Sequence, residues 1–600
     1  MRFKSKQVGN YQVFAVTGTN TVSFAIDFTE AETEGLLGFA LERHDPSEDE
    51  RYFLYGFKVF ESVFPTPTPD IVVSTHDHPV QSFVYDDFTA KPDRSYTYYF
   101  HPLKGKAKNI DRSAAPIPIT VKTEPVFSDL EHDIFFNRGV ASSQAYQRRF
   151  GGKSPEQLTQ SGKPEKAQEA LDWLSRDLDE AMFRFIAQAQ AGDTLLCCFY
   201  EFRYEPIVLA LKQVADERNV TLKIIIDAKA NQTKTAKAFP REENLHLIEK
   251  VGLVVGTQVL LREAKKNDIQ HNKFMVLLRG ANAVPSEVWT GSTNLSIGGI
   301  YGQTNVGHWL RNADVAMMFK EYWELLATDP GAKAGDDGTE VRRKNGQFRK
   351  AVAAIDAATD GWQDYPAGVT PIFSPRPGLK ILEMYASLLD GAVDLACITL
   401  AFGVNKLFKE RLADNTQRNA LTFFLLEKED KPDKDHPDAF TRLSAKNNTY
   451  MAFGSYLQDP IHQWARETTA RTLGFNKHVS FIHSKFLLKD PLGNDPIVVT
   501  GSANFSEPST NENDENMVVI RGDMRVADIY FTEFNRLFFH YYFRSIQEQL
   551  GRRGNSNDGA SLFLDETDSW LTKYTAGSLK RKRVEVFLKM ENVQTLALDD

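Results

Sequence analysis

The sequence has 600 residues, of which 42% are hydrophobic and 25% are charged, and its formal net charge is −9. This composition is ordinary for a globular protein that buries a core, and the length predicts several domains. The acidic balance does not indicate a general nucleic-acid binder, although a local basic groove is compatible with an acidic chain. The N-terminal residues lack the apolar core of a signal peptide, and no apolar stretch reaches the roughly 18 residues of a membrane span. We therefore expect a cytoplasmic protein.

Residues 1–125 are predicted to form an all-β module. Short segments rich in β-branched and aromatic residues, such as TVSFAIDF and RYFLYGFKVF, alternate with clusters of Pro, Gly and Asp. The pattern resembles that of a fibronectin type III or immunoglobulin-like sandwich. Such a module suits the docking of a protein partner, oligomerisation or the shaping of substrate access, and we do not expect it to carry chemistry.

An α/β pattern begins near residue 126. Ser154, Pro155 and Gln157 have the spacing of a helix start with a capping box. The segments TLLCCFYEF, IVLALKQVADERNV and TLKIIID follow as strand, helix and strand, which predicts a βαβ unit. The cysteines lie in apolar runs, so we expect them to be buried and reduced; they are Cys197, Cys198 and Cys397.

An internal repeat organises the chain. Residues 291–310 align without a gap on residues 501–520, and the segments 268–278 and 313–326 match 480–490 and 527–540. Two copies predict two similar α/β halves that pack around a pseudo-twofold axis. The expected parts are the β module (1–125), the first half (126–327), a linker (328–347), the second half (348–550) and a C-terminal tail with a basic run (551–600).

Each copy of the repeat carries His-x-Lys in a strand-like run and then Gly-Ser-x-Asn. Because alternate residues of a strand lie on one face, the His and the Lys of a copy point at the same site. Two imidazoles can act as nucleophile and general acid on a phosphodiester, while ammonium and amide groups bind its oxygens. The lysines can supply the charge that a metal ion supplies elsewhere, so we expect neither metal nor cofactor. The motif residues are His271, Lys273, Gly291, Ser292 and Asn294, then His483, Lys485, Gly501, Ser502 and Asn504.

The paired motifs resemble the signature of the phospholipase D superfamily, which is His-x-Lys, four residues, Asp, and later Gly-Ser-x-Asn. The resemblance covers roughly residues 160–550, and the second copy is complete, with Asp490 and a downstream Glu515. The first copy has Leu278 in place of the Asp and Asn305 in place of the Glu. The resemblance implies that the Asp supports packing away from the catalytic centre, so Leu278 should be tolerated.

The resemblance also implies that the downstream carboxylate contacts an imidazole of the other half, which pairs Glu515 with His271. A carboxylate on one ring nitrogen fixes the tautomer and stabilises the cationic ring. We therefore expect His271 to be the nucleophile that forms a phosphohistidine and His483 to be the general acid and then the base. The expected roles are catalysis for His271, Lys273, Asn294, His483, Lys485, Asn504 and Glu515, substrate binding for Ser292, Ser502 and Asn305, and support for Asp490.

The sequence thus predicts a metal-independent phosphodiesterase with no cofactor. The family contains enzymes that cleave nucleic acids, enzymes that cleave lipids and enzymes that make phospholipids, all with one kind of site. We favour a nuclease acting on DNA or RNA, because the sequence has no secretion signal, membrane segment or lipid-binding amphipathic stretch. Two alternatives stay open: a phospholipase D-type enzyme with a phospholipid substrate, and a non-catalytic scaffold, which the missing carboxylate at Asn305 would suit.

Overall fold

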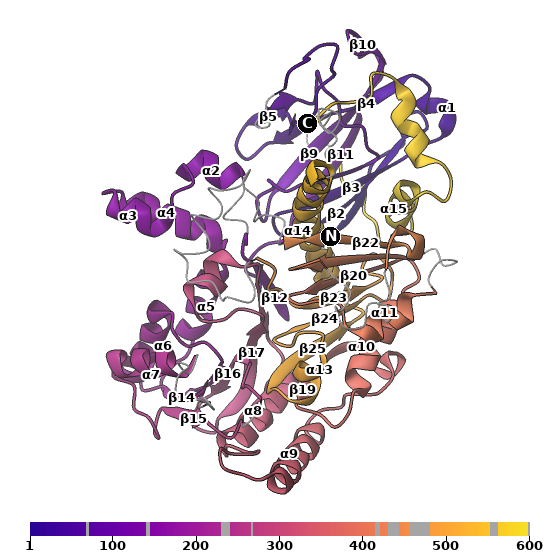
Figure 1. Cartoon of the computed structure of the whole chain (residues 1–600). Coiled ribbons are helices and arrows are strands. Elements are labelled where there is room, and N and C mark those ends of the chain that lie inside the picture. The colour runs from indigo at the N-terminus through magenta and orange to yellow at the C-terminus, as the bar shows by residue number, and fades with distance from the viewer. Residues whose placement is uncertain are drawn as a thin grey trace.

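The computed structural model describes residues 1–67, 71–139, 144–229, 240–265, 268–414, 420–429, 443–454, 481–552 and 562–597. An N-terminal β region lies above two α/β halves, and the long helix α14 (Met524–Arg552) runs along their junction (Figure 1). Helix α14 contacts strands of all three parts, among them β2, β12 and β22. Among the described helices, none combines the length and hydrophobicity that crossing a bilayer requires.

The N-terminal region is all-β and antiparallel, as predicted. One sheet has the order β1-β2-β3-β8, and the other has the order β10-β9-β4-β5 with β11 also paired to β9. Phe24 packs edge-on against Tyr98 and Phe100, with ring centroids 4.7 and 5.2 Å away. The elements are β1 (Arg2–Lys4), β2 (Gln12–Thr17), β3 (Val22–Asp27), α1 (Glu30–Thr33), β4 (Leu36–Asp45), β5 (Glu50–Phe53), β6 (Tyr55–Gly56), β7 (Val73–Ser74), β8 (Val84–Asp87), β9 (Ser95–Lys106), β10 (Asn109–Asp111) and β11 (Ile117–Lys122).

The two α/β halves have the same sheet topology, which confirms the prediction drawn from the repeat. The strand orders are β12-β18-β17-β16-β13-β14-β15 and β19-β25-β24-β23-β20-β21-β22. The first sheet contains β12 (His132–Phe136), β13 (Thr194–Phe199), β14 (Thr221–Asp227), β15 (Val259–Arg262), β16 (Lys273–Arg279), β17 (Val284–Gly291) and β18 (Val306–Leu310). The second contains β19 (Gly368–Ser374), β20 (Leu395–Leu400), β21 (Leu421–Leu426), β22 (Thr449–Phe453), β23 (Phe486–Lys489), β24 (Ile497–Gly501) and β25 (Glu515–Arg521).

The helices follow the sequence signals closely. The predicted βαβ unit is formed by β13, α6 and β14, whose strands are parallel. Ser154 caps α3 in a complete capping box with Gln157. The helices of the halves are α2 (Gln144–Phe150), α3 (Pro155–Gln160), α4 (Pro164–Ser175), α5 (Leu178–Ala187), α6 (Glu205–Arg218), α7 (Arg241–Val251), α8 (Ala313–Ala327), α9 (Gly338–Ala353), α10 (Lys380–Asp390), α11 (Lys406–Leu412) and α13 (Glu507–Asn511).

One segment of the chain differs from the prediction made from its composition, and the cysteines agree with theirs. The segment expected to be a linker, 328–347, contains the start of α9, which Asp337 caps through the backbone amides of Thr339 and Glu340. Charged residues dominate this helix because only a narrow stripe of it, including Phe348 and Val352, is buried. The three cysteines are buried and free, as expected.

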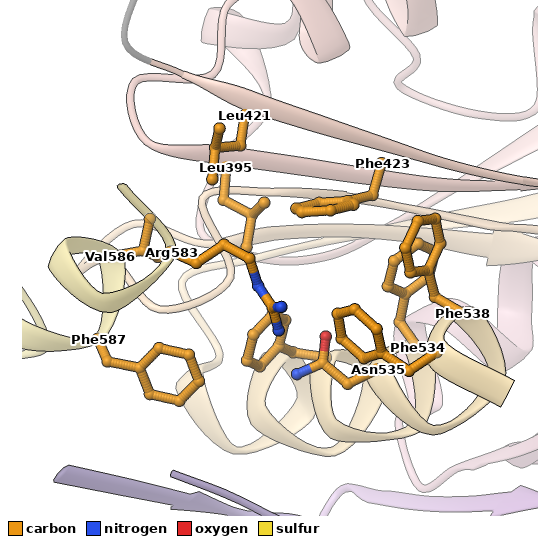
Figure 2. Close-up of a pocket in the computed structure, with 11 residues that line it drawn as sticks. Leu395, Leu421, Phe423, Phe534, Asn535, Phe538, Arg583, Val586 and Phe587 are labelled. Carbon is orange, nitrogen blue, oxygen red and sulfur yellow. The ribbon is translucent and has the colours of Figure 1, made fainter. Parts of the chain in front are cut away.

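The described part of the C-terminal segment packs against the β region. Trp570 donates its indole N–H to the carbonyl of Leu36, and Gln594 forms a bridge with Phe3. The basic run begins α15 (Leu579–Leu588). Figure 2 shows the side chain of Arg583 pointing into a cavity between α14 and α15, where its guanidinium lies 4.2 Å from the ring centroid of Phe539. The basic run is therefore packed against aromatic side chains.

We expect the Trp570→Ala substitution to destabilise the protein by about 3–5 kcal/mol, because it removes a side chain that is only 1% exposed. The exposed Leu130, at 53%, provides a matched control, since truncation there should cost less than ~0.5 kcal/mol. The free energies of unfolding of both variants are measured by urea unfolding, followed by far-ultraviolet circular dichroism, which does not depend on tryptophan fluorescence. Equal midpoints for the two variants would show that the C-terminal segment does not stabilise the fold.

Candidate active site

The two His-x-Lys motifs lie at the starts of equivalent strands. Lys273 begins β16, and Lys485 immediately precedes β23. Each ammonium group donates to the backbone carbonyl of the histidine in its own motif, at 2.5 Å in the first copy and 2.6 Å in the second. The imidazoles of His271 and His483 are 8% and 5% exposed. Each motif thus holds a His and a Lys close together at the end of a central strand, with the imidazole still reached by solvent.

Each imidazole is bonded by a side chain from the opposite half. Nδ1 of His271 lies 2.9 Å from both carboxylate oxygens of Glu515, which begins β25. Nδ1 of His483 lies 2.9 Å from Oδ1 of Asn305, which directly precedes β18. The predicted contact between Glu515 and His271 is confirmed. These cross-half contacts bring the two motifs into one site.

The hydrogen bonds of Asn305 fix the proton on His483. Its Nδ2 donates to the carbonyl of Gly299 at 2.7 Å, so its Oδ1 must face His483. Because an amide oxygen only accepts, Nδ1 of His483 carries the hydrogen and Nε2 presents a lone pair to the site. The same Oδ1 also accepts from the hydroxyl of Ser292 at 2.8 Å. Both polar atoms of the Asn305 side chain are used by the protein.

The two serines of the Gly-Ser-x-Asn motifs have the same task. Ser292 donates to Asn305, and Ser502 donates to Oε2 of Glu515 at 2.7 Å. Each serine hydroxyl also accepts a backbone N–H, from Val306 and Asn516 respectively. We therefore propose that Ser292, Ser502 and Asn305 position the imidazoles, in place of the substrate binding that the sequence suggested.

The motif glycines allow two strands to approach closely. A Cβ on Gly291 would lie 2.2 Å from the carbonyl oxygen of Val306, and one on Gly501 would lie 2.3 Å from that of Asn516. Any side chain there would push β17 from β18, or β24 from β25. Glycine is needed at both positions because only a residue without a Cβ fits this spacing. The spacing matters for the site because Asn305 and Glu515, the partners of the imidazoles, lie at the starts of the neighbouring strands.

Asn294 and Asn504 occupy equivalent places in the two copies, and each leaves one side-chain atom unpaired. Oδ1 of each is buried and has no hydrogen bond within the described residues. Buried amide oxygens are normally paired, and unpaired ones cost about 1–3 kcal/mol. Because an amide oxygen only accepts, a ligand group that donates a hydrogen bond would satisfy these two atoms.

Asp490 lies away from this centre and connects the ends of two neighbouring strands, β23 and β20. Its carboxylate accepts the backbone N–H groups of Val393, Asp394 and Leu395, at the start of β20. In the first half, where Leu278 replaces it, Asp193 before β13 accepts the N–H of Gly280 after β16. The same junction between neighbouring strands is thus held by a carboxylate from the other strand, which explains why Leu278 is accommodated.

The structure adds residues that the motifs did not reveal. Tyr200 directly follows β13, and its half-buried ring lies edge-on to His271 with centroids 4.9 Å apart and 5.5 Å from Nζ of Lys273. Asn516 donates to Oδ1 of Asn272 at 2.8 Å, so the side chain of Asn272 points into the interior. The signal for Tyr200 is its place at the strand end next to the first motif, which sequence spacing alone does not single out.

Burial shifts the ionisation of the whole cluster. It lowers the pKa of His271 well below its ordinary value, and the ammonium groups of Lys273 and Lys485 lower it further. It lowers the pKa of His483 in the same way, with Lys485 and Lys273 adding to it. Burial also lowers the pKa of Lys273 to about 8 and raises the pKa of Glu515 to about 8. Burial therefore disfavours positive charge on these groups, and a bound anion would favour it.

A family model described as cardiolipin synthase, PLD-like domain, matches residues 182–326 and 437–538. The first segment contains His271, Asn294 and Asn305, and the second contains His483 and Glu515. No curated protein matches the chain.

Several solved structures have a similar arrangement, at low identity. Phosphatidylserine synthase of Haemophilus influenzae is 10% identical with a TM-score of 0.40, over 64% of this chain and 92% of that chain. Nuc of Salmonella typhimurium, a phospholipase D family member, is 16% identical with a TM-score of 0.21, over 29% and 94%. Yeast tyrosyl-DNA phosphodiesterase is 12% identical with a TM-score of 0.27, over 54% and 82%. Similarity at this level does not define a substrate.

Proposed function

Because the chain belongs to the phospholipase D superfamily of phosphodiesterases, we propose that it hydrolyses nucleic acid through a phosphohistidine intermediate, without a metal ion. The observation that carries this proposal is the pair of imidazoles, each bonded through Nδ1 to the opposite half. This bonding leaves both Nε2 atoms for chemistry on one phosphorus atom. The two ammonium groups beside them can bind the non-bridging oxygens.

In the first step, Nε2 of His271 attacks phosphorus and a P–N bond forms. The P–O bond to the leaving group breaks, and His483, which takes up a proton on Nε2 from solvent when the substrate anion binds, gives that proton to the leaving oxygen. Glu515 favours His271 as the nucleophile, because its carboxylate stabilises the positive charge that the ring gains on phosphorylation. The amide of Asn305 gives no such stabilisation, so protonated His483 is the stronger acid.

In the second step, a water molecule attacks phosphorus and gives its proton to Nε2 of His483. The P–N bond breaks, and its electron pair returns to His271. Throughout, Lys273 and Lys485 offset the charge on the phosphoryl oxygens, and Asn294 and Asn504 are proposed to donate to the same oxygens through Nδ2. The scaffold alternative fits poorly with a buried site that keeps all these groups.

The proposed nucleic-acid substrate is supported by Tyr200. Its ring lies against His271 and Lys273 and is only half buried. An aromatic ring at this place can stack on a base next to the reacting phosphate, and such stacking contributes about 1–3 kcal/mol per base.

We expect the protein to cleave DNA or RNA in the presence of EDTA. Single- and double-stranded DNA and RNA, and phosphatidylcholine vesicles, are incubated with the wild type and with the His483→Ala variant. Loss of the general acid should slow cleavage about 10²–10⁴-fold. Release of choline with all nucleic acids intact would replace the nucleic-acid substrate with a lipid, and loss of activity in EDTA would contradict the metal-independent reaction.

We expect the covalent intermediate to form on His271. Bis(4-nitrophenyl) phosphate has a leaving group that needs little protonation, so His483→Asn should still react once with it and then accumulate phosphoenzyme. Quenching in base followed by mass spectrometry locates the phosphoryl group, with His271→Asn as the control that should carry none. Mapping the group to His483 in the wild type would reverse the proposed roles.

The dependence of kcat/KM on pH should be bell-shaped. On the acid side, the raised pKa of Glu515, about 8, lets the His271–Glu515 pair keep an extra proton that must leave before Nε2 attacks. On the alkaline side, Lys273, whose pKa is lowered by burial to about 8, and Lys485, whose pKa burial lowers well below its ordinary value, lose the charge that attracts phosphate. The double variant Lys273→Arg/Lys485→Arg should move only the alkaline limb, to higher pH, since a guanidinium stays charged. An unchanged alkaline limb in that variant would rule out the two lysines as its origin.

A further inference from the structure

The two halves are joined by backbone bridges directly beside the imidazoles. One bridge pairs Gln270 with Asp514, and the other pairs Thr304 with Ile482. In the first, the N–H of His271 donates to the carbonyl of Asp514 at 2.9 Å, and the N–H of Asp514 donates to the carbonyl of Ile269 at 3.0 Å. Asp514 is therefore bonded to the main chain of His271 and is also the residue before Glu515.

The side chain of Asp514 is held by two buried cations. Its carboxylate is 0% exposed and lies 2.9 Å from Nε of Arg262 and 2.8 Å from Nζ of Lys265. Lys265 also donates to the carbonyl of Glu512, at 3.0 Å. The cations come from the end of β15 and the loop after it, in the first half, while Asp514 belongs to the second half. The ion pairs therefore cross the same interface as the contact between His271 and Glu515.

Further charges complete this network. Nη1 of Arg262 lies 2.7 Å from Asp329, and Nζ of Lys265 lies 3.8 Å from Asp268. Both cations lie over the ring of Phe348, at 5.2 and 5.8 Å from its centroid. A buried ion pair gains little over apolar packing, because desolvation of the charges offsets their attraction. The ion pairs of Asp514 are therefore better explained by the precise geometry that they impose than by a gain in stability.

The equivalent position in the other half is uncharged. Thr304 stands where the second copy has Asp514, and its hydroxyl accepts the N–H of His483 at 3.1 Å. Within the part of the chain that the structure describes, this charged network lies beside the imidazole that has a carboxylate partner. Its asymmetry follows the asymmetry of Glu515 and Asn305.

We propose that Asp514, held by Arg262 and Lys265, is a positioning residue that keeps Glu515 aligned on Nδ1 of His271 and so makes His271 the nucleophile. The inference rests on the proposed phosphohistidine reaction. The two hydrogen bonds of the Asp514 main chain and its peptide bond to Glu515 fix both partners of that contact. If the carboxylate of Asp514 loses its charge, Arg262 and Lys265 shift, and the imidazole and its partner move apart.

The test compares Asp514→Asn with Asp133→Asn. Asp133 is also buried and ion-paired, 2.8 Å from Arg311, but lies on β12 away from the imidazoles. Both variants should lose stability. Only Asp514→Asn should form phosphoenzyme from bis(4-nitrophenyl) phosphate more slowly, by about 100-fold in the single-turnover rate, because displacement of reacting groups by about 1 Å has effects of that size. KM should change much less.

A second measurement does not depend on turnover. In protein labelled with ¹⁵N-histidine, the Nδ1 signal of His271, assigned with His271→Gln, should shift in Asp514→Asn and stay in place in Asp133→Asn. If Asp514→Asn does not fold, the double variant Lys265→Met/Asp514→Asn is used in its place, because it removes one positive and one negative charge from the network. Equal phosphoenzyme rates and equal His271 signals in the Asp514 and Asp133 variants would overturn the proposal. A wild type that forms no phosphoenzyme would defeat the proposed function alone, and the ¹⁵N signals would still decide the role of Asp514.

Discussion

The site depends on each half supplying the partner for the imidazole of the other. Nδ1 of His271 meets Glu515 from the second half, and Nδ1 of His483 meets Asn305 from the first. Burial and the two ammonium groups oppose charge on both rings, so the two rings differ in the group that bonds Nδ1. Neither half contains a complete catalytic imidazole. The duplicated fold is therefore a condition for the chemistry, and a shift of one half against the other would change both rings at once.

The sequence predicted those parts that are encoded locally. The repeat indicates two halves of one topology, because the same alternation of apolar residues recurs in both copies. His-x-Lys identifies the strand faces at the site, and Gly291 and Gly501 mark places where a Cβ would meet a carbonyl oxygen at 2.2 and 2.3 Å. Even the contact between Glu515 and His271 could be expected, because the family resemblance carried the geometry that spacing does not.

The sequence could not predict what depends on packing between distant segments. In the sequence, Asn305 indicates only that a carboxylate is missing from the first copy. Its hydrogen bonds to Gly299, Ser292 and His483 show that it fixes the tautomer of His483. The role of Asp193 at the junction that Leu278 leaves open depends on a register between β13 and β16 that composition does not contain. For the same reason, the sequence does not show where the basic run near the C-terminus packs, with Arg583 over the ring of Phe539.

The difference between the two partners allows one duplicated motif to perform two kinds of chemistry. A carboxylate on both rings would favour the cation on both, and the ring that acts as the acid would then release its proton less readily. Amides on both would leave a phosphorylated ring without a counter-charge in a buried site. With Glu515 on one ring and Asn305 on the other, the first ring gains from becoming cationic and the second releases its proton readily. Two ammonium groups beside one carboxylate leave a net positive charge, and burial makes this charge unfavourable. The lowered pKa values of Lys273 and Lys485 indicate this effect. A phosphodiester carries a single negative charge and removes that imbalance when it binds. Binding of the substrate therefore also favours protonation of the acid, His483.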